Sequence, residues 1–325
     1  MTRPSRQKSI SLIVRIAGTL ISTALFVLLI SRQKWDVVFD KVTGVAFWAI
    51  LLSLLFYLLS YGFNTLRWCL LLWAQDVKIS FWKAYTLTWA GNFASNFLPS
   101  TIGGDGFRML AVHPYTGKKT ISIGSVVLDR IINMAAMACL IPAPLIIFGS
   151  SLRSLLGSAI VLPPGLQKLF EKYFPKFVNA YRSWASRPSA LIYAFLSAWP
   201  SNLFPMAATY LLAHQLGMNV SFWQALGVQT VTYFLSVLPI SVNGYGLREV
   251  AYTTLYAALG ATVEQASTLA LLTRFLTVLS TIPGAIWLSS AVTNAAGLDD
   301  VPGSAREGPG SNRDDTGSNR ESLNP

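Results

Sequence analysis

Seven charged side chains stand inside segments that are otherwise apolar, and their types point to one kind of chemistry. They are the arginines Arg108, Arg130, Arg248 and Arg274 and the acids Asp105, Asp129 and Glu249. A charge near the centre of a bilayer costs roughly 2.5–3.5 kcal/mol on insertion scales, so each such residue is a functional candidate. Guanidinium groups grip phosphate oxygens in a bidentate manner. The pattern therefore predicts a substrate-binding site for a phosphate-bearing group, with the carboxylates positioning the arginines.

Helical spacing adds polar neighbours to this site. Ser125, Asp129 and Asn133 recur every four residues and therefore share one face of a helix. Asn96 lies four residues after Asn92 in another short helix. We expect Asn133 to face the cavity, and we expect Asn96 either to line it or to bond broken backbone.

A purely structural interpretation of the same charges stays open. Arg108 could pair with Asp105 or Asp129, and Arg248 with Glu249 or another acid, only to hold the chain together. The two interpretations are compatible, because such ion pairs could open to admit a substrate.

Composition places these residues in a membrane. The chain has 325 residues, of which 53% are hydrophobic and only 12% charged, about half the charge density of a soluble domain. Several apolar runs reach the roughly 20 residues needed to cross a bilayer. The net charge is +11, and the basic residues lie between hydrophobic segments. This placement is typical of cytoplasmic loops that face anionic lipid head groups, and it does not favour nucleic-acid binding. The two cysteines and two histidines are not clustered, so neither a metal site nor a cofactor is expected.

The charged residues belong to two similar segments. Phe81-Trp82 opens the first and Phe222-Trp223 the second, and each leads through Leu-Pro and a glycine-rich turn to an arginine nine residues after the proline. Chance similarity between apolar segments is the alternative, but the matched Trp, Pro, Gly and Arg spacings disfavour it. The predicted turn residues are Pro99, Gly103, Gly104, Pro239, Gly244 and Gly246. Asp105 stands where a helix N-cap would.

Each repeated segment predicts a re-entrant hairpin. Tyr85–Leu98 would be about 21 Å long as a helix, which is too short to span, and Gly106–Val112 could return as a second short helix. Phe222–Leu238 and Leu247–Leu259 form the corresponding pair. Duplicated and interrupted hydrophobic segments are the best sequence pointer to a transport site.

The resulting fold class is an all-α integral membrane protein with about six full transmembrane helices plus two re-entrant hairpins, eight hydrophobic units in total. The full spans are predicted at Leu12–Ile30, Val45–Tyr61 or on to Leu72, Ser122–Ile141, Leu145–Leu162, Leu191–Leu212 and Gln265–Val292. The membrane domain covers residues 1–292, with repeat halves centred on 81–141 and 222–292. Residues 163–187 form either a basic amphipathic helix on the membrane surface or an ordinary basic loop. Residues 293–325 are polar and expected to be disordered.

Counting spans from a cytoplasmic N-terminus puts the first hairpin inside and the second outside, which makes the repeat inverted. Arg67, Lys78 and Lys83 then fall on the cytoplasmic side, as the positive-inside rule requires, whereas Arg32 and the nearby Lys34 and Lys41 fall outside and count against it. The inversion is lost if Leu145–Leu162 does not cross.

Together these motifs resemble one known family. The residues Leu98-Pro99, Gly103-Gly104-Asp105, Arg108, then Asp129-Arg130, and later Pro239, Gly244, Gly246 and Arg248-Glu249 are similar to those of the lysylphosphatidylglycerol synthase transmembrane-region, or flippase-like, family. The resemblance covers about residues 10–292, although Asn243-Gly244-Tyr245-Gly246 is less glycine-rich than the family pattern. It implies handling of lipids. Lysyl transfer is not expected, because that activity belongs to an attached cytosolic domain in two-part members.

The sequence therefore predicts a plasma-membrane protein that binds, and translocates, a phospholipid or polyprenyl-phosphate-linked lipid, without catalytic residues. Its expected partners are an anionic or phosphate-bearing lipid, the membrane and a lipid-synthesising enzyme, but no nucleic acid. Two alternatives remain open: a membrane glycosyltransferase that uses a lipid-phosphate-sugar donor, and a non-catalytic subunit of a lipid-synthesis complex. The paired acids that such a glycosyltransferase would use occur only in the tail, at Asp299-Asp300 and Asp314-Asp315.

Overall fold

The computed structural model describes residues 42–96, 101–156, 184, 186–237 and 246–288, and in these ranges the regular structure is helical, with no strand. The all-α class is thus confirmed. The helices of the described chain are α3 (Phe47–Trp73), α4 (Phe81–Ser95), α5 (Thr101–Thr116), α6 (Lys119–Ala138), α7 (Pro142–Leu156), α9 (Pro188–Gln215), α10 (Phe222–Val237), α11 (Leu247–Ala258) and α12 (Val263–Thr281).

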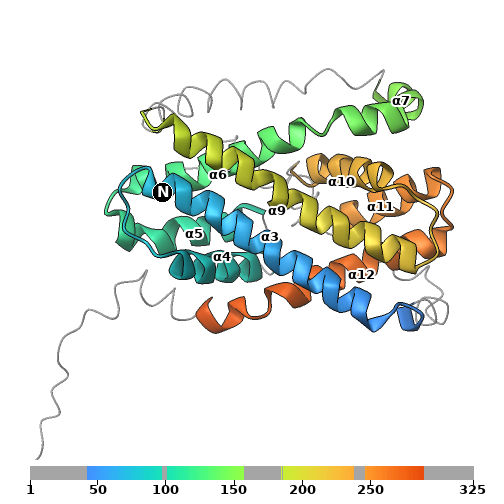
Figure 1. Ribbon diagram of the computed structural model, residues 1–325, viewed down its shortest axis with the longest axis horizontal. Helices are drawn as coiled ribbons and strands as arrows, with labels where there is room; N and C mark the ends of the chain where they lie inside the picture. Colours follow the sequence, from blue (N-terminus) through green and yellow to red (C-terminus); the bar gives the residue numbers. More distant parts are fainter. Residues whose placement is uncertain (1–41, 97–100, 157–183, 185, 238–245, 289–325) are drawn as a thin grey trace, which may run out of the picture.

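Two long antiparallel helices, α3 and α9, form the centre of the molecule. At one end the backbone N–H of Ala46 donates to Oε1 of Gln215 at 3.3 Å. At the other end Nη1 of Arg187 donates to the carbonyl of Trp73, also at 3.3 Å. Figure 1 shows the two helices side by side along the molecule, with α4 and α5 toward one end and α10 and α11 toward the other.

The first half of helix α3 carries large apolar side chains outward, which is the reverse of a soluble helix, whereas Trp68, Leu71 and Leu72 near its end are buried. Phe47, Leu51 and Leu55 follow one another at four-residue intervals and are exposed, whereas Ala49 and Ser53 on the opposite face are fully buried. Small and hydroxyl-bearing residues let helices approach closely inside a membrane, and the outer face meets lipid. By length and composition, α3 and α6 are the two described helices that could cross a membrane.

The helices occur in the same order twice. A long helix is followed by two short ones and then by one of intermediate length: 27, 15, 16 and 20 residues from α3 to α6, and 28, 16, 12 and 19 residues from α9 to α12. The repeat read from the sequence therefore extends back to include α3 and α9. The short helices are about 18–24 Å long at 1.5 Å per residue, less than a bilayer core.

The two halves are joined by hydrogen bonds between their helices. Nδ2 of Asn96, at the end of α4, donates to Oγ1 of Thr281 in α12 at 2.9 Å. In the mirrored position, Nδ2 of Asn133 in α6 donates to the hydroxyl of Tyr233 in α10 at 3.0 Å. The first short helix of each half thus hydrogen-bonds to the last helix of the other half.

The structure corrects the expected turn at Gly103 and Gly104, because both residues lie inside α5. Gly104 serves helix packing instead: a Cβ placed on it would collide with Oγ of Ser95 and with the carbonyl of Gly91 in α4. Asp105 is likewise inside α5 and is no N-cap. Glycines in membrane helices commonly serve such close backbone approach.

Several other expectations change or fall outside the described residues. Helix α12 ends at Thr281, before Pro283, which has no N–H to continue it. Helical structure resumes at residues 284–288, so the predicted span Gln265–Val292 is interrupted and its last residues lie outside the described ones. Helix α7 begins at Pro142 and is described only to Leu156, so the crossing predicted at Leu145–Leu162 is not described in full. Outside the described residues lie the span Leu12–Ile30, the turn residues Pro99, Pro239 and Gly244, nearly all of 163–187, and the tail.

The packing of α4 on α5 predicts opposite effects for two neighbouring glycines. Gly104→Ala should destabilise the protein by about 1–3 kcal/mol, the usual cost of overpacking, because the added methyl group meets α4 backbone. Gly106→Ala is the matched control, since a Cβ there meets no atom within 4 Å and alanine favours a helix. Thermal unfolding of the purified variants in detergent measures both. Equal melting temperatures for the two variants would refute this account of Gly104.

Candidate functional site

A buried carboxylate lies at the centre of the site in the first half. Asp129, on α6, is 1% exposed. Its Oδ1 accepts from Nε of Arg67 at 2.6 Å, and its Oδ2 accepts from Nη1 of Arg108 at 3.2 Å. Both oxygens are therefore held by arginines, from α3 and α5. We name Arg67, Asp105, Arg108, Asp129 and Arg130 the Asp129 cluster.

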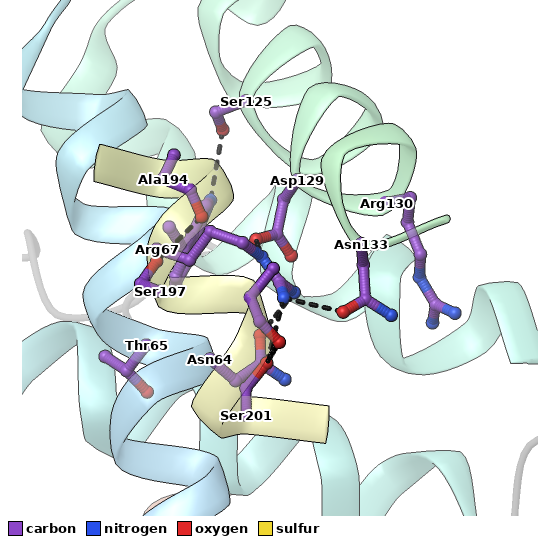
Figure 2. Close-up of polar contacts among 12 residues, drawn as sticks. Asn64, Thr65, Arg67, Ser125, Asp129, Arg130, Asn133, Ala194, Ser197 and Ser201 are labelled. Carbon is purple, nitrogen blue, oxygen red and sulfur yellow. Dashed lines mark hydrogen bonds and ion pairs between the residues drawn. The ribbon is translucent and has the colours of Figure 1, made fainter. Parts of the chain in front are cut away.

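Arg67 is the residue that sequence reasoning missed. In the sequence it counted only as one of the positive charges on the cytoplasmic side, but it lies within α3 and is 3% exposed. Besides Asp129, its donors reach Oδ1 of Asn133 at 2.7 Å and Oδ1 of Asn64 at 3.0 Å (Figure 2). The signal in the sequence was the pair Asn64 and Arg67, one helical turn apart in a run that is otherwise apolar.

The Asn133 side chain hydrogen-bonds to side chains on three other helices. Its Oδ1 accepts from Arg67 and from Nδ2 of Asn202 in α9 at 3.0 Å, while its Nδ2 donates to Tyr233. This amide thus joins α3, α6, α9 and α10. Its hydrogen bonds thus go to protein groups on partner helices.

Arg108 is buried, but only one of its three guanidinium nitrogens is hydrogen-bonded by the described residues. It is 4% exposed, its guanidinium carbon lies 4.2 Å from the ring centroid of Trp68, and Nη1 binds Asp129. Nε and Nη2 have no hydrogen-bond partner among the described residues. A buried charged donor without a partner is costly, so these two N–H-bearing atoms are ready to bind an acceptor.

Asp105 and Arg130 close the cluster on its outer side. Oδ2 of Asp105 lies 2.5 Å from Nε of Arg130, and Oδ1 lies 3.7 Å from Nη1 of Arg108. The Arg130 side chain is 44% exposed, and Figure 2 shows it directed away from Arg67. Three arginines against two aspartates give the cluster a formal charge of +1, so it favours an anion.

The second half carries a smaller group, which we name the Glu249 cluster: Arg248, Glu249 and Arg274. Glu249, on α11, is 1% exposed. Its Oε2 accepts from the backbone N–H of Gly246 at 2.8 Å, where Gly246 caps the helix at φ 78°. Its Oε1 lies 3.8 Å from Nε of Arg274. The guanidinium of Arg248 lies over the ring of Tyr252 at 5.5 Å.

The contacts of the described residues thus divide the four predicted arginines between two groups, one in each half. Asn96 lies at the end of α4 and bonds Thr281 rather than either group's carboxylates. The described residues include no group of three or more His, Cys, Asp or Glu side chains arranged to hold a metal ion.

Comparison with known proteins identifies relatives. The family model described as the lysylphosphatidylglycerol synthase TM region matches residues 15–284, a range that includes both clusters. The UPF0104 membrane protein PH1989 of Pyrococcus horikoshii is 23% identical over an alignment of 268 residues. The match covers 67% of this chain and 78% of that protein.

The buried position of Arg67 predicts a large loss of stability when it is removed. Arg67→Ala leaves the Asp129 carboxylate with one weaker partner, and breaking a buried pair typically costs about 3–5 kcal/mol. Unfolding of the purified protein in mixed micelles of increasing denaturing-detergent content measures the free energy. Arg187→Ala is the control, because its pair with Asp76 is solvent-exposed and worth at most about 1 kcal/mol. Similar losses in the two variants would contradict the central role of Arg67.

Proposed function

Because the chain belongs to the lysylphosphatidylglycerol synthase transmembrane-region family, a family of membrane proteins related to lipid metabolism, we propose that it binds the phosphate of a lipid head group at the Asp129 cluster and moves that head group across the membrane. The single observation that carries the proposal is Arg108: a membrane-buried guanidinium with one donor atom on Asp129 and two donor atoms unbonded among the described residues.

The ion pairs of the cluster allow Arg108 to change partner. A phosphate oxygen pair can accept from Nε and Nη2 in a bidentate manner. If Arg108 turns toward the phosphate, Asp129 is still neutralised by Arg67 at 2.6 Å. The carboxylate therefore never becomes an unpaired buried charge, which would cost several kcal/mol. The formal charge of +1 matches the single negative charge of a phosphodiester.

We further propose that the two halves form an inverted repeat around the lipid path, with α4–α5 and α10–α11 as re-entrant hairpins. Three features support this arrangement: the repeated order of helices, the antiparallel packing of α3 on α9, and the shortness of the hairpin helices. Inverted repeats with broken helices at the membrane midplane are typical of secondary transporters. The proposed location is the plasma membrane, with a cytoplasmic N-terminus.

Transport assays on Arg108 variants test the proposal. The purified protein is reconstituted into liposomes with a fluorescent phosphatidylglycerol, and an impermeant quencher reports the outer-leaflet fraction over time. Arg108→Ala should abolish head-group movement. Arg108→Lys keeps the charge but loses the planar fork, so we expect transport to fall about 10- to 100-fold, the equivalent of one charge-assisted hydrogen bond.

Arg187→Ala provides the matched control, because it removes an arginine whose pair with Asp76 is exposed, and transport should remain at the wild-type rate. Gel filtration and thermal unfolding establish that each variant is folded. A folded Arg108→Ala protein that transports the lipid at the wild-type rate would overturn the proposal.

A further inference from the structure

Of the three buried carboxylate residues in the described part of the chain, the two most deeply buried, Asp129 and Glu249, are held in different ways. Both oxygens of Asp129 accept from arginines. Glu249 uses only Oε2, for the backbone N–H of Gly246. Its Oε1 is buried and has no hydrogen-bond partner among the described residues, and its nearest guanidinium nitrogen, Nε of Arg274, is 3.8 Å away. Glu249 is therefore a carboxylate buried in the protein interior with one oxygen not hydrogen-bonded by the described residues.

The groups around Glu249 could accommodate a proton on it. The charged and titratable groups packed there are Arg248 and Tyr252 on α11 itself, Arg274 from α12 and Tyr57 from α3. Helix α10 contributes the neutral Gln229, which accepts from the hydroxyl of Tyr252. Among the described residues, Arg274 is the one cation within ion-pair distance of the carboxylate, and Arg248 acts on it from farther away, so the charge state of Glu249 depends chiefly on where the Arg274 guanidinium points.

We propose that Glu249 is a proton-binding site that couples lipid movement to protons, an inference that rests on the proposed function. When the moving head group passes from the Asp129 cluster to the Glu249 cluster and its phosphate engages Arg274, Glu249 loses its nearest counter-charge, and one proton from solution bonds to Oε1. No other bond forms or breaks. When the phosphate leaves, Arg274 returns and the proton dissociates. Burial disfavours an unpaired carboxylate, which gives this exchange its direction.

Linkage makes the effect reciprocal: if phosphate binding promotes protonation, protonation promotes phosphate binding by the same factor. The anion and the proton would then travel together, and a proton gradient could drive the lipid. Asp129 cannot play this part, because Arg67 stays on it when Arg108 leaves.

The test uses the purified full chain in detergent and dihexanoyl-phosphatidylglycerol, a soluble short-chain phosphodiester lipid. Calorimetric titration in two buffers of different ionisation enthalpy gives the number of protons taken up per lipid bound. The wild-type protein should take up as much as about one proton, and its affinity should increase as the pH falls, by up to about tenfold per pH unit.

Glu249→Gln should bind the same lipid with no proton uptake and no such pH dependence. Glutamine also accepts at this position of a capping box, so the contact with Gly246 and the fold are retained. Glu264→Gln is the matched control: it removes a carboxylate from the first turn of α12, outside the cluster, and proton uptake should remain as in the wild type.

The outcomes separate the two proposals. Lipid binding by the wild type without proton uptake, or with uptake that persists in Glu249→Gln, overturns the proton site and leaves the proposed function standing. Failure of the wild type to bind the lipid at all overturns both. A merely structural Glu249 would leave the proton count unchanged in the glutamine variant.

Discussion

A carboxylate in hydrocarbon must keep a cation beside it, and the arrangement of the first half follows from that requirement at Asp129. Arg67 from α3 and Arg108 from α5 reach it from two sides, and the remaining donors of Arg67 fix Asn64 and Asn133. Three helices, α3, α5 and α6, are thereby joined by one ion-pair network. The proposed function depends on the same arrangement, because a carboxylate with two cations is still neutralised when one of them leaves.

The two halves repeat in helix order but differ in their charges. Asp129 precedes Arg130, whereas Thr273 precedes Arg274 at the corresponding place, and the hydroxyl of Thr273 bonds the backbone of its own helix. Among the described residues of the second half, no carboxylate is held by arginines on both oxygens. Its acid, Glu249, lies instead on the short helix and caps it. In the first cluster both carboxylate oxygens of Asp129 are thus hydrogen-bonded, whereas in the second only Oε2 of Glu249 is hydrogen-bonded by the described residues.

Much of this architecture could be predicted from the sequence, because its signals are local. The helix class and the short paired helices follow from apolar run lengths, and the pairing of Arg108 with Asp105 or Asp129 was one of two open interpretations of the charges. The role of Arg67 was missed, since an arginine near the end of a long apolar run looks like a membrane-edge anchor, and its local signal was only Asn64 one helical turn before it. Gly103 and Gly104 look like a turn by composition, but the glycine pair Gly91 and Gly104 instead permits backbone contact between two helices. The contact of Asn96 with Thr281 joins residues far apart in the chain, and a single sequence gives no sign of it.

The exchange of helices between the halves bears on how such a molecule can arise. Asn96 finds its partner on α12, and Asn133 finds one of its partners on α10, so each copy of the repeat completes hydrogen bonds that the other begins. A single copy standing alone would present these amides to lipid, where unsatisfied polar groups are costly. If the chain arose from an ancestor with one copy, that copy would have needed to assemble as a symmetric pair. A fusion of two such copies would leave the sequence of each constrained by the other at these positions.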